Sequence, residues 1–97
     1  MKKSQVVKRI QEAGLVAVVR AETADQAFVT IDALLAGGVQ AVEVTYTVPG
    51  AGAVIKQLAE RYKDGSVLIG AGTVLDAETA RDAILNGAQF GVSPCLN

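Results

Sequence analysis

The chain has 97 residues, of which nine are basic and ten acidic, so its formal net charge is −1 and neither a nucleic-acid surface nor an anionic-membrane surface is expected. Hydrophobic residues make up 51% of the chain, which argues against disorder, and aromatic residues make up only 4%, which disfavours the stacking of bases. No apolar run is long enough to span a bilayer, no signal-peptide pattern is visible, and a single cysteine excludes an internal disulfide, so we expect one cytoplasmic domain.

The first two predicted elements are a helix and a strand. Ser4 is expected to cap a helix that Gly14 ends in the left-handed conformation, because glycine adopts a positive φ without strain. The next run, LVAVVR at 15–20, is apolar at every position except the last. A strand that is apolar on both faces is typical of a parallel sheet covered on both sides.

A second helix and a second strand follow. Thr23 and Gln26 fit a capping box, in which the two side chains and the backbone of the first turn bond one another. Apolar residues then recur at helical spacing until Gly37 and Gly38, which are expected to end the helix. The second strand is predicted at 39–45, where valine and threonine favour an extended backbone.

The rest of the chain repeats this alternation. A third helix is expected to run to Gly65 and to be followed by a strand at 67–72. Asp76 is expected to cap a fourth helix, which Gly87 ends, and the last strand is predicted at 89–94.

Four such units in a row imply an α/β fold with a parallel sheet and right-handed crossovers. A closed (β/α)8 barrel needs eight units and about 250 residues. The chain is therefore predicted to be either half of such a barrel, preceded by a lead-in helix, or a small open doubly wound sheet. The half-barrel would leave its first and fourth strands as unpaired edges, which tend to pair with another chain.

Polar side chains gather where the predicted strands end. Of all the charged residues, only Arg20 and Glu43 lie in or at the end of an apolar strand. A buried carboxylate is costly unless it is paired, hydrogen-bonded or neutralised. Ligands bind at the carboxyl ends of parallel strands in open sheets and in barrels alike. The pattern predicts a small-molecule site formed by these strand-end residues: Arg20, Glu43, Thr45, Thr47, Gly72, Thr73, Ser93 and Pro94.

Most of these residues also have a purely structural interpretation. Glu43 could form a buried ion pair with Arg20 or with a lysine of another subunit, and Arg20 could simply be solvated beyond its strand. Thr73 could be a turn hydroxyl bonded to nearby backbone, and Pro94 could do no more than end its strand. Cys95 has no obvious activator in the sequence, so we interpret it as an inert thiol.

Two common kinds of site are disfavoured. The chain contains no histidine, which removes the commonest general base and most zinc sites. The run GAGTVL at 70–75 begins like a dinucleotide-binding fingerprint, but Leu75 stands where the third glycine belongs, and the run follows the third strand rather than the first.

Three blocks carry a family resemblance: GGVQAVEVTYTVPGA (37–51), IGAGTVLDAETA (69–80) and GAQFGVSP (87–94). In this order and spacing they resemble the bacterial KDPG/KHG aldolases, which cleave 2-keto-3-deoxy-6-phosphogluconate or 4-hydroxy-2-oxoglutarate to give pyruvate. The resemblance covers essentially all 97 residues. It implies a class I aldolase on a (β/α)8 barrel that needs no metal or other cofactor, takes a keto acid as substrate and is usually a homotrimer.

The resemblance also implies roles for single residues. Glu43 matches the general acid/base that moves protons at the Schiff-base and carbon–carbon bond steps. Thr73 and the backbone of Gly72 match the groups that bind the pyruvate carboxylate. Arg20 matches an arginine that faces substrate, and Pro94 matches a proline that lines the pocket.

The sequence departs from the family in two respects. Some relatives carry a carboxylate-binding arginine where this chain has Thr47, so Thr47 is the expected substrate contact there and carboxylate binding leans more on Arg20 and Thr73. The family's Schiff-base lysine lies on the sixth strand, which this chain lacks. All of its lysines fall in predicted helices or tails: Lys2, Lys3, Lys8, Lys56 and Lys63.

We therefore interpret residues 1–97 as a single domain that forms the amino-terminal half of an aldolase barrel and is inactive alone. Two alternatives stay open, namely a non-catalytic half-barrel that self-associates and a small-ligand binding module. A homo-oligomer is expected in either half-barrel case, a trimer for a full-length enzyme and a dimer for this half.

Overall fold

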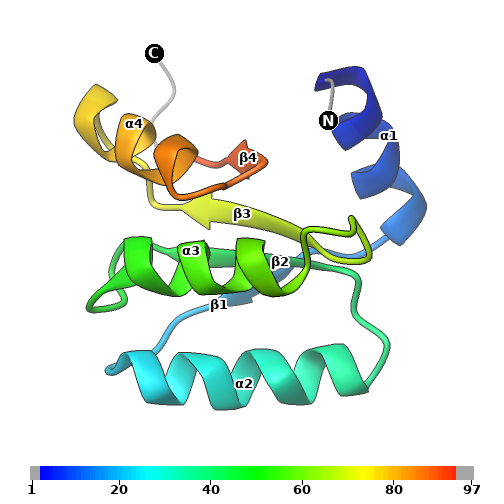
Figure 1. The fold of residues 1–97 in the computed structure, drawn as a ribbon, viewed down its shortest axis with the longest axis horizontal. Helices are drawn as coiled ribbons and strands as arrows, with labels where there is room; N and C mark the ends of the chain where they lie inside the picture. The colour runs from blue at the N-terminus through cyan, green and yellow to red at the C-terminus, as the bar shows by residue number, and fades with distance from the viewer. Residues whose placement is uncertain (1–2, 94–97) are drawn as a thin grey trace.

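Four short strands form one parallel sheet in which the order in space, β1-β2-β3-β4, is the order in the sequence (Figure 1). The computed structural model describes residues 3–93. This alternation of helices with parallel strands confirms the predicted α/β fold. The elements are α1 (Lys3–Ala13), β1 (Ala17–Val19), α2 (Ala24–Ala36), β2 (Ala41–Thr45), α3 (Ala51–Arg61), β3 (Leu68–Gly72), α4 (Ala77–Leu85) and β4 (Phe90–Gly91).

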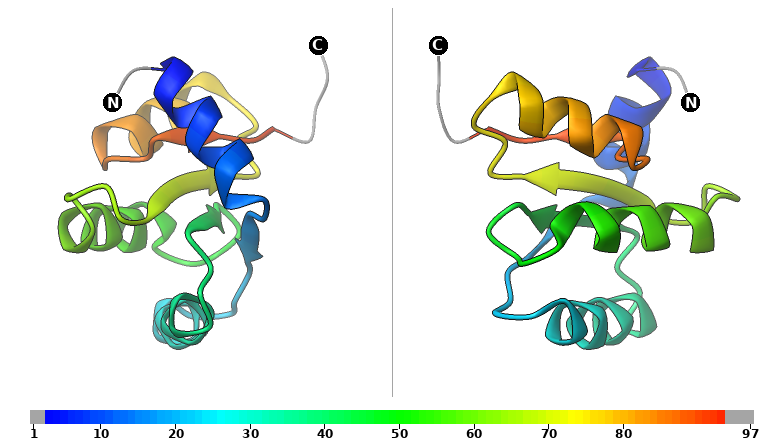
Figure 2. Two further views of the ribbon diagram at one scale, coloured as in Figure 1. Left: turned by 90° about the vertical axis from the view of Figure 1, so that its right-hand side faces the viewer. Right: turned by 60° about the vertical axis from the view of Figure 1, so that its left-hand side comes forward.

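The helices divide the sheet into two different faces. Viewed close to the strand direction, α2, α3 and α4 form an arc on one side of the sheet, and α1 lies on the other side (Figure 2, left). Right-handed crossovers place the connecting helices on one side, and burial of their apolar stripes against the strands stabilises that arrangement. The core on this side is formed by fully buried residues of the strands and helices: Val19, Ile31, Val42, Val44, Val54, Ile55, Leu58, Ile69 and Ala71.

The opposite face of the sheet carries the only buried charge among residues 3–93, the carboxylate of Glu43. Strand residues alternate between faces, and residues paired in register share a face. One row across the sheet therefore runs from Val18 to Glu43, Gly70 and Phe90. We call this side the Glu43 face and define it by these residues: Val18, Ala41, Glu43, Thr45, Leu68, Gly70, Gly72 and Phe90.

The predicted strand boundaries were too wide at the two edges of the sheet. β1 covers 17–19 rather than 15–20, and Leu15 and Val18 are 61% and 52% exposed. The prediction that this strand is covered on both faces is therefore wrong, because Val18 belongs to the Glu43 face, which α2 does not cover. β4 comprises only 90–91 within the described residues, and the predicted end of that strand lies outside them.

Local capping signals predicted the starts of α2 and α4, with an error in one partner of the α2 cap, and were wrong for α1. Thr23 caps α2 by accepting a hydrogen bond from the Gln26 N–H at 3.1 Å, but the Gln26 side chain accepts from the N–H of Glu22 rather than of Thr23. Asp76 caps α4 by accepting from a backbone N–H at 2.7 Å. Ser4 lies inside α1 and is not its cap. None of the helices within 3–93 has the length and apolar character that crossing a membrane requires.

Candidate functional site

The carboxyl ends of the strands bring most of the predicted site residues to one edge of the sheet. Arg20 follows β1 directly, Glu43 lies in the middle of β2, and Gly72 ends β3. In the loop after β2, the hydroxyls of Thr45 and Thr47 form a hydrogen bond of 2.6 Å. An open cavity of about 560 Å³ beside these strand ends is lined by Arg20, Ala21, Glu22, Thr47 and Pro49.

Glu43 is 7% exposed, and its two sequence neighbours point into the core on the opposite face. Within residues 3–93 no basic side chain forms an ion pair with it, so the geometry does not support a buried Glu43–Arg20 bridge. Arg20 is exposed, and it acts on Glu43 through the electrostatic attraction between its positive charge and the carboxylate. Burial raises the pKa of the Glu43 carboxyl above its ordinary value of 4.5, and the Arg20 guanidinium offsets part of this rise.

This raised pKa predicts that Glu43 destabilises the folded chain at neutral pH. Below about pH 4.5 the carboxyl is protonated in both the folded and the unfolded state. The folded state binds this proton more tightly, and the resulting contribution to stability is fully present there. That contribution is lost as the pH rises through the folded-state pKa. Glu43→Gln is therefore expected to raise the free energy of unfolding at pH 7, with a gain that shrinks as the pH falls below that pKa.

Urea denaturation of wild type and Glu43→Gln at a series of pH values measures this difference. Glu60→Gln, at an exposed position of α3, is the matched control and should leave the curve nearly unchanged at every pH. A stability difference for Glu43→Gln that is the same at every pH would contradict the expected linkage.

The carboxyl of Glu43 lies against the backbone of β3 at Gly72. A Cβ atom at Gly72 would stand 2.9 Å from Cδ and 3.0 Å from Cγ of Glu43, and closer still to its Oε1. Real Cβ atoms essentially never make contacts that short. The two residues are therefore in direct contact, and the position requires glycine for as long as the carboxyl lies there.

Thr73 adopts φ +55°, the only positive φ of a non-glycine residue within 3–93. A β-branched residue in the left-handed region is strained, and such residues cluster at ligand sites. Its side chain is half-buried, and no hydrogen bond to neighbouring backbone within the described residues supports the turn interpretation. Pro94 and Cys95 lie outside the described residues.

The contacts of Tyr46 and of Phe90 at this site were not predicted. The Tyr46 hydroxyl donates a hydrogen bond to Oδ2 of Asp82 at 2.7 Å, and the Tyr46 N–H donates to the Gly72 carbonyl at 2.9 Å, so the loop after β2 is held against both α4 and β3. Burial, the hydrogen bond with Asp82 and the charge of that carboxylate all raise the pKa of Tyr46. The Phe90 ring lies over Gly70 on the Glu43 face. Neither contact has a sequence signal, because each joins segments that are distant along the chain.

Comparison with known proteins places this arrangement in a family. The sequence model described as KDPG and KHG aldolase matches residues 6–97. The chain is 36% identical over 92 residues to 2-dehydro-3-deoxy-phosphogluconate aldolase from Treponema pallidum, covering 95% of this chain and 43% of that protein. It is 34% identical over 93 residues to the Haemophilus influenzae enzyme of the same name, covering 96% and 43%.

A solved structure is similar to the chain in fold as well as in sequence. KDPG aldolase from Legionella pneumophila, captured with pyruvate as a covalent carbinolamine intermediate, superposes with a TM-score of 0.74 at 33% identity, covering 84% of this chain and 39% of that one. The chain thus spans less than half the length of the relatives that it matches. Its four-stranded sheet matches part of the (β/α)8-type barrel of these aldolases, and the chain belongs to the KDPG and KHG aldolase family.

Proposed function

We propose that this chain supplies the amino-terminal part of a class I aldolase, which cleaves a substrate of the 2-keto-3-deoxy-6-phosphogluconate or 4-hydroxy-2-oxoglutarate type to pyruvate and an aldehyde. The observation that carries the proposal is Glu43, a buried carboxyl with a raised pKa and no ion pair within the described residues, which contacts Gly72 at the carboxyl end of β3, the end of the strands where barrels bind ligands. The Legionella relative, whose pyruvate forms a covalent carbinolamine, supports the same chemistry.

In the proposed reaction Glu43 carries protons. A lysine amine adds to the keto carbon of the substrate and loses water to give an imine. The Glu43 carboxylate then takes the proton of the C4 hydroxyl, the C3–C4 bond breaks, and its electron pair moves into the imine to give an enamine. The Glu43 carboxylic acid returns the proton to C3, which becomes the methyl group of a pyruvate imine, and water then hydrolyses this imine to release pyruvate and the lysine amine. A raised pKa suits a group that both takes and gives a proton near neutral pH.

The remaining strand-end groups are proposed to bind the pyruvate carboxylate. Arg20 supplies a positive charge at the mouth of the site, and Thr47 lines the same open cavity. The hydroxyl of Thr73 and the backbone at Gly72 are the proposed hydrogen-bonding groups, and Pro94 is proposed to line the pocket. The left-handed backbone of Thr73 supports its role, because strain of this kind persists where a ligand site requires it.

The imine-forming lysine is proposed to come from outside these 97 residues. Lys3 and Lys8 lie in α1, Lys56 lies in α3, and Lys63 follows α3, so no lysine within 3–93 is at a strand end. The chain alone is therefore expected to be inactive. We further propose a cytoplasmic location and a homo-oligomer, a trimer when the barrel is complete; the single cysteine supports the former, and the free sheet edges support association of this half.

Trapping with borohydride tests the assignment of the nucleophile. The 97-residue chain is expected to form no reducible adduct with pyruvate. A chimera in which residues 1–97 replace the matching part of the Treponema pallidum aldolase should form one adduct, on a lysine of the Treponema portion, and should release pyruvate from substrate. Mass spectrometry after reduction locates the adduct. A high-yield adduct on one lysine of the isolated chain would contradict the assignment.

A further inference from the structure

We propose that Phe90 is a positioning residue for Glu43: its ring, seated on Gly70, and the bare backbone of Gly72 together direct the Glu43 carboxyl toward the carboxyl end of the sheet. This inference rests on the proposed role of Glu43 as the acid/base. It concerns a residue to which the proposed mechanism gives no part in proton transfer or in binding of the carboxylate.

The register of the sheet determines which residues lie beside Glu43. Glu43 pairs with Gly70, and Gly70 pairs with Phe90, so the three lie in one row of the Glu43 face. Gly72 is paired with Thr45 in the next row of that face, closer to the strand ends. Because both glycines lack a side chain, two hollows lie beside Glu43 on β3, one directly opposite it and one diagonally forward.

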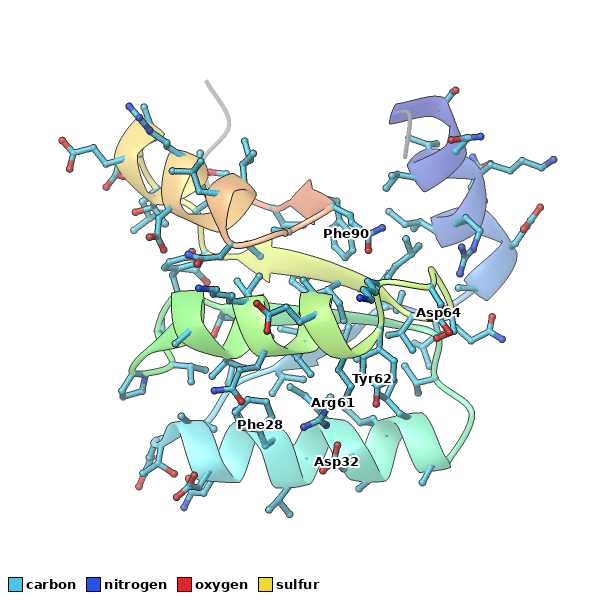
Figure 3. All side chains as sticks on the ribbon, in the orientation of Figure 1. Phe28, Asp32, Arg61, Tyr62, Asp64 and Phe90 are labelled. Atoms are coloured by element: carbon cyan, nitrogen blue, oxygen red, sulfur yellow. The ribbon has the colours of Figure 1, made fainter. Side chains whose placement is uncertain are left out.

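Phe90 fills the hollow directly opposite. A Cβ at Gly70 would stand 2.5 Å from Cδ2 of the Phe90 ring and closer still to Cε2 and Cζ, so the ring occupies the space above the Gly70 backbone. In Figure 3 the ring projects from β4 beside β3. The space that Glu43 would reach by extending straight across its own row is therefore occupied.

Gly72 provides the hollow that remains. The Cγ, Cδ and Oε1 atoms of Glu43 all lie within 3.0 Å of the place where a Gly72 Cβ would be. The carboxyl thus leans forward by one row, toward Thr45 and the strand ends where the substrate is proposed to bind. The aromatic ring lies on Gly70, and the carboxyl lies on Gly72. Because the ring occupies the space at Gly70, the carboxyl is directed to Gly72.

Few other groups are able to direct this carboxyl. Among residues 3–93 it forms no ion pair, and the one charged group that acts on it is Arg20, which follows β1. The neighbouring positions of the same face on β3 and β4 are Gly70, Gly72 and Phe90, none of which carries a charge or a polar side chain. On β2 itself, Thr45 shares the face, but its hydroxyl is hydrogen-bonded to that of Thr47. On the side of β3 and β4, the direction of the carboxyl is therefore set by shape.

Nuclear Overhauser contacts in the 97-residue chain test this directly. In the wild type we expect a contact from the Glu43 γ-protons to the α-protons of Gly72 and none to those of Gly70, whose resonances the ring should shift upfield. In Phe90→Ala the upfield shift and the Gly72 contact should be lost, and a Gly70 contact should appear. Phe90→Tyr, which keeps the ring, should restore the wild-type pattern.

Gly72→Ala gives a second, independent readout. The added Cβ displaces the carboxyl into solvent, so the midpoint of its carbon-detected pH titration should fall toward the ordinary value of 4.5. Gly91→Ala is the matched control, because a Cβ there meets its neighbours at ordinary distances of 3.8 and 3.9 Å. An unchanged contact pattern in Phe90→Ala, or an unchanged midpoint in a folded Gly72→Ala, overturns the proposal. If either variant does not fold, the other decides.

The chimera separates this proposal from the proposed function. There Phe90→Ala should lower kcat by about 10²-fold with little change in KM, as expected for a misplaced catalytic group. If the Overhauser pattern changes as expected but the unmutated chimera cleaves no substrate, the proposed function fails and the positioning stands. If the chimera is active and Phe90→Ala leaves kcat unchanged, the positioning proposal fails and the function stands.

Discussion

Glu43→Gln is expected to lower the turnover of aldol cleavage by about 10²–10⁴-fold in the chimera with the Treponema pallidum aldolase, because general acid/base groups contribute effects of this size. The amide is close to isosteric with the carboxyl but is unable to take the C4 hydroxyl proton. Formation of the pyruvate imine should fall much less, since a lysine amine carries out that attack. Steady-state pyruvate release and borohydride trapping on the same sample measure the two steps separately.

A matched control and a contradicting outcome are available for this prediction. Glu60→Gln makes the same chemical change on an exposed face of α3 and should leave both steps unchanged. Turnover near that of the wild type in Glu43→Gln would return Glu43 to a structural role. Together with a gain in stability at neutral pH, a large loss of turnover would show that the fold tolerates an unfavourable carboxyl for the sake of its chemistry.

The 97-residue chain is expected not to be a stable monomer. β1 and β4 are unpaired edges of a parallel sheet, and a typical monomer exposes an apolar patch of only about 300–600 Å². Joining β4 of one copy to β1 of another, twice around a two-fold axis, would remove both edges. The apolar residues most exposed within the described chain include many near these edges or on α4: Leu15, Val18, Leu75, Ile84, Leu85 and Val92.

Light scattering on the purified chain measures this association. Val18→Lys places a charge on the Glu43 face of an edge strand and should shift the population toward a species of 10.0 kDa. Gln57→Lys is the matched control, because Gln57 is exposed on α3, which packs against the central strands β2 and β3, and should leave the association unchanged. A monodisperse wild type of 10.0 kDa with sharp cooperative unfolding would show that four strands suffice and would favour the small-ligand module.

The order and the type of the elements are readable from the amino-acid sequence. The signals are local: apolar runs predict strands, helical spacing predicts helices, and capping residues mark where a helix begins. Asp76 caps α4 as predicted, and Gly14 and Gly38 adopt φ +70° and +100° beyond α1 and α2. Each of these preferences depends on a few neighbouring residues, so it is readable without knowledge of the rest of the fold.

Sequence also singled out Glu43, because a carboxylate within an apolar run is costly and therefore conspicuous. The surroundings of this carboxylate follow from contacts between distant segments, which the sequence does not reveal. The contact of Phe90 with Gly70, the contact between Glu43 and Gly72, and the Tyr46–Asp82 hydrogen bond each join segments far apart in the chain. They depend on the register between parallel strands, which is set by the packing of α2, α3 and α4 on the opposite face. The same packing leaves Val18 exposed, although the strand around it is as apolar in sequence as a central strand.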